Sequence, residues 1–136
     1  MSTLVITDTE VQRRKQLADQ AMELIKGCLP WESEEPNCIM TSYKGFYLQI
    51  SISDVHPLIV FCFVRAIPEN GECSMDKVNE SNLLGILGCH CINREAGCYT
   101  YRTVTWLETD LSRARLVEIL DRCVEEAVKG YINIIS

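Results

Sequence analysis

Two neighbouring strand-like segments, residues 46–53 and 58–67, constrain the fold more than any other feature of the sequence. In the first segment every second residue is apolar, which predicts a strand with one buried face. The second segment is apolar at nearly every position except Arg65. A strand that is apolar on both faces has to be covered on both faces, and helices can provide one of the two covers. The second cover is therefore the main question that this chain poses. The alternating apolar residues of the first segment are Phe46, Leu48, Ile50 and Ile52.

Helices are predicted at both ends of the chain and in its middle. Thr9-Glu10-Val11-Gln12 has a capping-box pattern and precedes an apolar stripe, which predicts a helix over residues 10–27. Ser74 is a suitable cap for a short helix over residues 75–84. Asp110 is a suitable cap for a last helix, whose apolar stripe runs as far as Tyr131.

Strand patterns fill the space between these helices. Lys44-Gly45 predicts a tight hairpin turn, and Gly97 suits the left-handed position of a second hairpin loop. Short connections between successive strands give an antiparallel sheet, and the two long amphipathic helices should pack on one face of it. We therefore expect an α+β fold in the order α-β-β-β-α-β-β-α, built as one domain over residues 1–136. The predicted strands span residues 38–43, 46–53, 58–67, 86–93 and 98–107.

Charge and hydropathy exclude several classes of partner. The formal net charge is −6, and an acidic surface repels the phosphates of a nucleic acid. No segment approaches the roughly 18 consecutive apolar residues of a membrane span. The apolar run Leu4-Val5-Ile6 is too short for the core of a signal peptide. We expect a cytoplasmic protein that binds neither nucleic acid nor membrane.

The predicted order of elements, with the residues that punctuate it, resembles the YbjN family and the type III secretion chaperone-like proteins. The local anchor is Val78-Asn79-Glu80-Ser81-Asn82-Leu83, which is similar to the Asn-x-x-Asn element of that group. A hairpin and Thr109-Asp110-Leu111-Ser112, leading into the final helix, follow at the expected distance, so the resemblance covers about residues 10–131. It implies a non-catalytic domain, with no cofactor, that binds segments of other proteins or regulates them, and that pairs as a homodimer.

Eight cysteines raise the alternative of a small metal-binding or redox-sensing protein that uses Cys89, Cys91 and Cys98. On a strand, Cys89 and Cys91 point to one face and His90 to the other, so the histidine cannot easily join both thiols at one zinc ion. Zinc sites also favour two residues between paired cysteines rather than one. We therefore favour reduced cysteines, mostly buried in the core, with His90 exposed.

A catalytic site is not expected. Nucleophilic catalysis needs a nucleophile, a base and an orienting group, and neither His56 nor His90 stands in a recognisable catalytic motif. Adjacent carboxylates such as Glu34-Glu35 and Glu125-Glu126 fit a solvated surface better than acid–base machinery. The chain also lacks a glycine-rich phosphate-binding loop.

The predicted sheet has more apolar surface than its helices can cover, which indicates an interface. Tyr99 and Tyr101 share one side of the last strand, while Trp106 lies on the other, and neither side is plainly polar. Asn79 and Asn82 share a side of the middle helix, where they either tie it to the next strand or contact a partner chain. Candidate interface residues are Tyr99, Tyr101, Trp106, Asn79 and Asn82. The partner is expected to be a second copy of the chain, or another protein or peptide segment.

Overall fold

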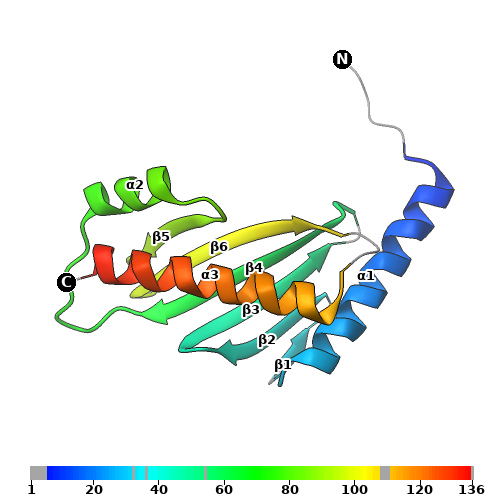
Figure 1. Ribbon diagram of the computed structural model, residues 1–136, viewed down its shortest axis with the longest axis horizontal. Helices are drawn as coiled ribbons and strands as arrows, with labels where there is room; N and C mark the ends of the chain where they lie inside the picture. Colours follow the sequence, from blue (N-terminus) through cyan, green and yellow to red (C-terminus); the bar gives the residue numbers. More distant parts are fainter. Residues whose placement is uncertain (1–5, 32, 36, 54, 108–110, 136) are drawn as a thin grey trace, which may run out of the picture.

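The computed structural model describes residues 6–31, 33–35, 37–53, 55–107 and 111–135. Over these residues the chain forms an α+β fold in which an antiparallel sheet carries helices on one face (Figure 1). The strands lie side by side in the order β1-β2-β3-β4-β6-β5. The elements are α1 (Asp8–Cys28), β1 (Ser33–Glu35), β2 (Cys38–Tyr43), β3 (Phe46–Ser53), β4 (Leu58–Ala66), α2 (Met75–Leu84), β5 (Cys89–Asn93), β6 (Cys98–Trp106) and α3 (Arg113–Ile134).

The predicted order of elements is confirmed, with two differences in the strands. The three residues of β1 fall in a segment whose sequence reads as a polar connector, and they pair with the first half of β2. Strand β5 begins at Cys89, three residues after the predicted start. The backbone N–H groups of Ile86 and Leu87 bond to the Glu126 carboxylate of α3 instead of to a neighbouring strand.

The helix caps differ from the predicted ones. Helix α1 is capped by Thr7, whose hydroxyl accepts a hydrogen bond from the backbone N–H of Glu10 at 3.2 Å. Thr7 and Glu10 have the same spacing as the capping box that we placed two residues later. Helix α3 is capped by Ser112, whose hydroxyl accepts from the N–H of Arg115 at 3.1 Å, and the predicted cap Asp110 lies outside the described residues.

The hairpin between β2 and β3 has the predicted two-residue turn. Lys44 has φ 44° and Gly45 has φ 88°, the left-handed backbone that a two-residue turn of type I′ requires at both positions. Because strand pairing is fixed on either side of this turn, Tyr43 lies opposite Phe46 and Ile39 opposite Ile50. This register places the alternating apolar residues of both strands on the same face of the sheet.

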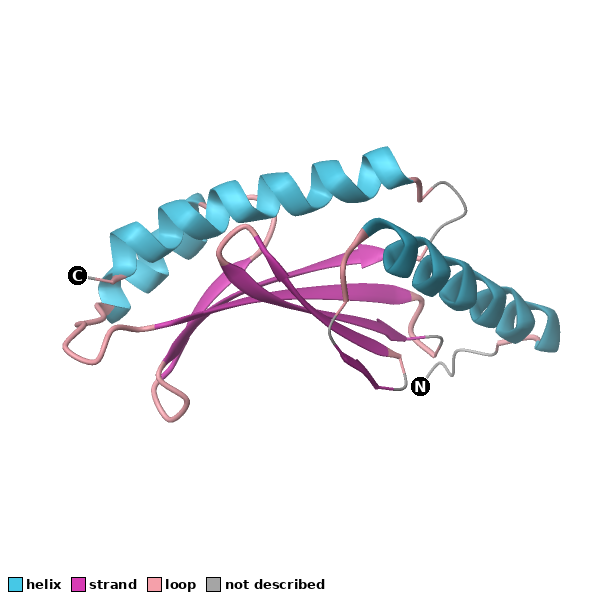
Figure 2. Ribbon diagram, turned by 90° about the horizontal axis from the view of Figure 1, so that it is seen from below, coloured by secondary structure: helices cyan, strands magenta, loops and turns pink. Residues whose placement is uncertain are grey.

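The three helices of the described residues all lie on one side of the sheet, and none of them covers the opposite face (Figure 2). The core forms between α1, α3 and the covered face, and the first strand pattern is confirmed because Leu48 and Ile50 are fully buried there. Gln49 and Ser51, on the other face, are only partly buried. None of the described helices is both long and apolar enough to cross a membrane.

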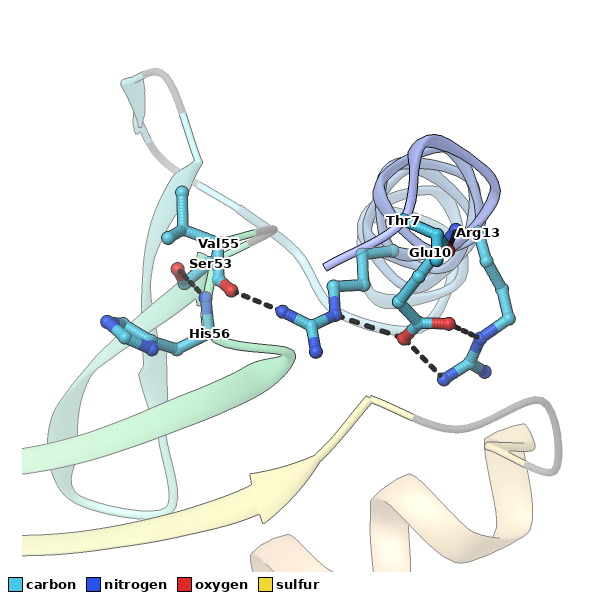
Figure 3. Close-up of polar contacts among 7 residues, drawn as sticks. Thr7, Glu10, Arg13, Ser53, Val55 and His56 are labelled. Carbon is cyan, nitrogen blue, oxygen red and sulfur yellow. Dashed lines mark hydrogen bonds and ion pairs between the residues drawn. The ribbon is translucent and has the colours of Figure 1, made fainter. Parts of the chain in front are cut away.

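Polar contacts hold α1 against the turn that joins β3 to β4. Glu10 accepts hydrogen bonds from Arg13 and Arg14, and these contacts lower the pKa of its carboxyl to about 2. Arg14 also donates to the backbone carbonyl of Val55 at 2.8 Å, across to the turn (Figure 3). One arginine therefore links the first turns of α1 to the sheet.

Helix α3 is held along its length by residues of the β2–β3 hairpin and of β4. Asp121 accepts hydrogen bonds from the Tyr43 hydroxyl at 2.5 Å and from the Lys44 ammonium at 2.6 Å. Near the end of the helix, the Tyr131 hydroxyl donates to the carbonyl of Ala66, and the Arg65 guanidinium lies over the Tyr131 ring. These contacts fix the direction in which α3 crosses the sheet.

We expect Leu48→Ala to lower the free energy of unfolding by about 2–5 kcal/mol, because it opens a cavity in a fully buried layer. Urea denaturation followed by circular dichroism measures this change. Val55→Ala, at an exposed turn position, is the matched control and should change the stability little. A stability loss near zero for Leu48→Ala would mean that the register of β3 is wrong.

Candidate protein-binding surface

The covered face of the sheet contains the tyrosines that the sequence suggested as interface residues. Tyr99 and Tyr101 are both fully buried, and Tyr99 packs edge-on against Tyr131 of α3. Their assignment to a surface is therefore corrected: strand parity puts them beneath α3, where they form part of the core. Their aromatic character alone could not reveal this, because both faces of β6 have mixed composition.

The opposite face, which we call the open face, consists of the outward positions of β2 to β6 and has no helix over it (Figure 2). Trp106 and Val104 of β6 are 64% and 49% exposed, and Leu58 and Val60 lie directly opposite them on β4. Tyr47 of β3 is also exposed. This surface matches the excess of apolar sheet predicted from the unbroken pattern of residues 58–67.

Arg102 lies at the midpoint of β6 on the open face, at the outward position next to Val104. It is paired across the sheet with Cys62 on β4 and with Cys89 on β5. Burial raises the pKa of the Cys62 thiol, and the charge of Arg102 opposes that rise. Within the described part of the chain, the Arg102 guanidinium takes part in no hydrogen bond or ion pair.

A second apolar surface lies at the end of α2 and in the loop that follows it. Leu83 and Ile86 are 86% and 89% exposed, among the most exposed apolar side chains of the described residues. Beside them runs a groove of about 550 Å³ between α2 and α3, lined in part by Leu84, Leu87 and Lys129. The loop is held rigidly over this groove because Glu126 accepts from two of its backbone N–H groups.

His90 forms the floor of the groove and is 4% exposed, so our expectation of an exposed histidine was wrong. The physical reason is the same strand parity, which places His90 beside Tyr101 on the covered face. Its Nδ1 atom shares a 2.6 Å hydrogen bond with the Tyr99 hydroxyl. Burial lowers the pKa of the imidazole, although the nearby Glu126 carboxylate acts in the opposite direction.

The two asparagines of α2 have different surroundings. Asn82 donates to the backbone carbonyl of His90 at 3.1 Å and accepts from its N–H at 2.6 Å. This agrees with the structural alternative, in which the asparagine ties α2 to the next strand. Asn79 is exposed. A contact of either residue with a partner chain stays a prediction.

The cysteines are less buried than the sequence led us to expect. Cys89 and Cys91 are exposed on the open face, and Cys98 is partly buried. The prediction that His90 points away from both thiols is confirmed. Among the described residues, no group of three or more histidine, cysteine, aspartate or glutamate side chains is arranged to hold a metal ion.

Comparison with known proteins places this architecture among the secretion chaperones. No family model matches the chain, and no curated protein matches it in sequence. A chain of the HopA1–SchA chaperone–effector complex is 12% identical, with a TM-score of 0.59 over 93% of this chain and 98% of that one. A chain of the ExsC–ExsE complex is 9% identical, with a TM-score of 0.60 over 94% and 98%.

YbjN from E. coli, described as a putative transcription regulator, is 9% identical, with a TM-score of 0.52 over 94% of this chain and 91% of that one. This chain therefore has the fold of YbjN and the type III secretion chaperones, as the resemblance in sequence implied. At these identities the likeness shows the fold alone.

We expect buried His90 to make stability depend on pH. Because its pKa is lower folded than unfolded, the unfolded chain takes up the proton first. The stabilisation is complete above the unfolded value of about 6.5 and is lost as the pH falls toward the folded value. Urea unfolding between about pH 8 and pH 5 should therefore show a steeper loss for the wild type than for His90→Gln. His56→Gln, in the exposed turn before β4, is the matched control. Parallel curves for the wild type and His90→Gln would contradict this prediction.

Proposed function

We propose that this protein is a non-catalytic, chaperone-like module that holds a segment of another protein against its open face. The observation that carries the proposal is the exposure of Trp106 and Val104 on a sheet face that no helix covers. Apolar patches of this kind on soluble proteins are usually interaction sites. The fold supports the same function, because one neighbour in structure is a chain of a chaperone–effector complex.

The surroundings of the histidines support a role without chemistry. The Nδ1 atom of His90 is engaged by Tyr99 in a buried layer, and His56 lies in an exposed turn. The free thiols favour a reducing compartment, so we place the protein in the cytoplasm. Exposed Cys89 and Cys91 keep a redox or metal-binding protein as the alternative, and metal analysis of protein purified without chelator would separate the two.

Peptide display tests the proposed function directly. We expect a random peptide library to yield binders of the wild-type protein whose affinity falls at least about tenfold with Trp106→Asp, since a charge there opposes burial of an apolar segment. Val117→Asp, at an exposed position of α3 away from the open face, is the matched control and should leave peptide binding unchanged. Failure to enrich any peptide that depends on Trp106 would contradict a binding role for the open face.

We further propose that the protein is a homodimer formed through the end of α2 and its following loop. A two-fold interface uses the same patch on both subunits. Such a patch therefore needs exposed apolar side chains and, close beside them, a groove that can receive the same side chains of the other subunit. Exposed Leu83 and Ile86 lie next to the groove between α2 and α3, and so provide both parts. This arrangement leaves the open face available for a different protein.

Sedimentation equilibrium at micromolar concentration tests the homodimer. The wild type should sediment as a dimer, and Ile86→Asp should dissociate it because a carboxylate would be buried without a partner. Val55→Asp introduces the same charge at an exposed turn and should leave the dimer intact. A wild-type mass of 15.5 kDa across the whole range would rule out the homodimer.

A further inference from the structure

The position of Arg102 indicates what kind of segment the open face binds. Moving along β6, the outward positions are Trp106, Val104 and then Arg102, with Leu58 and Val60 beside the first two on β4. Successive outward positions on a strand are roughly 6.7 Å apart. The apolar strip formed by these four residues is therefore followed by a positive charge, at a distance close to the length of one turn of an α-helix.

This charge has no partner of its own, although the protein is acidic. With 19 acidic residues and a net charge of −6, most cations on such a chain could find a carboxylate nearby. Arg102 has none among the described residues, and the outward positions of β2, β3, β4, β5 and β6 include no acidic side chain. The neighbours paired with it are Cys62 and Cys89, neither of which is an acidic residue. Any apolar segment laid over this face would desolvate the guanidinium, which is costly unless the segment brings an anion.

A second copy of this chain is a poor source of that anion. The first carboxylate on the same face is Glu35 of β1, which pairs with Cys38. It lies four strands away from β6, roughly 19 Å at 4.8 Å per strand. Two open faces packed together would also bring two unpaired Arg102 side chains into one interface.

Backbone hydrogen bonding indicates the conformation of the bound segment. A segment that lies on a sheet face cannot pair its backbone with the strands below it, so an extended chain would leave N–H and C=O groups without partners. A helix satisfies these groups internally and is the usual cover for a sheet. Helices α1 and α3 cover the opposite face of this sheet in that way.

We infer that the open face binds an amphipathic helix of a partner protein, with two apolar residues one turn apart and a carboxylate one turn further that pairs with Arg102. The inference rests on the proposed function and specifies the partner for the same surface. The apolar residues pack on Trp106 and Val104, and the carboxylate accepts the bidentate hydrogen bonds that a guanidinium offers. A run of several acidic residues is not expected, because the net charge of the protein repels it.

The test uses two fluorescent alanine-based helical peptides that differ in one residue. Each has two leucines one turn apart, and one turn further it has glutamate in the first peptide and glutamine in its twin. Fluorescence polarisation should show that the wild type binds the glutamate peptide about tenfold more tightly, as for a charge-assisted hydrogen bond at an interface. Arg102→Gln should abolish this preference, and Arg102→Glu should reverse it, because the two carboxylates would then repel each other. Arg94→Gln, in the exposed β5–β6 turn, is the matched control and should keep the wild-type preference.

The outcomes separate this inference from the proposed function. Equal binding of both peptides, lost in each case with Trp106→Asp, would overturn the role of Arg102 and leave the open face as a binding surface. Binding that does not depend on Trp106, or no binding of either peptide, would overturn the inference. The proposed function would then depend on its own peptide display result. If Trp106→Asp and Glu35→Gln each converted a wild-type dimer to a monomer, the occupant of the face would be a second copy, and the inference would also fail.

Discussion

The contact between α3 and the sheet at Gly130 is the constraint on which the rest of the structure depends. A methyl group at this position would overlap the His90 ring and come within 2.8 Å of the Tyr99 hydroxyl, so only glycine lets the helix lie this close. The close approach buries the His90–Tyr99 hydrogen bond. It also brings Glu126 within reach of the loop after α2, and Asn133 within 3.1 Å of the Ser81 hydroxyl. The placement of α2, the groove and the exposed loop all follow from the close approach of α3 to the sheet.

Because the three described helices all lie on the same face, the other face of the sheet has none of them over it. Alternation along β4 buries Ile59 and Phe61 under the helices and turns Val60 and Cys62 outward. The outward residues are too apolar for a fully solvated surface and include only one charge on β2 to β6. The fold thus builds its core on one face of the sheet and leaves an apolar surface on the other, where we propose that a partner binds. The α2 surface lies apart from it, so the proposed homodimer and the proposed partner segment would use different surfaces.

The fold was predictable from sequence because period-two and helical patterns are local signals, and β3 and α3 follow them closely. Three features were not predictable for physical reasons. Which side of β6 is buried depends on where α3 lies, so Tyr99 and Tyr101 could not be distinguished from Trp106 by composition. Residues 86–88 stay out of the sheet because the backbone N–H groups of Ile86 and Leu87 bond to Glu126, which is distant in sequence. The burial of His90 in β5 depends on Gly130 of α3, two elements further along the chain. The excess of apolar sheet was visible in the sequence, and Trp106 is exposed on the open face, although its contact with a partner stays a prediction.

The two hydrogen bonds between the Asn82 side chain and the backbone of His90 affect whether another strand can add to the sheet. An outermost strand normally exposes unpaired N–H and C=O groups, which act as a template for another strand and open a route to aggregation. At His90 of β5 a side-chain amide already occupies both groups, as a neighbouring strand would. At the opposite edge β1 is only three residues long, which offers little length for pairing. Lateral addition of strands is thus discouraged at β1 and at His90, which limits one route to aggregation for a protein with a broad apolar face.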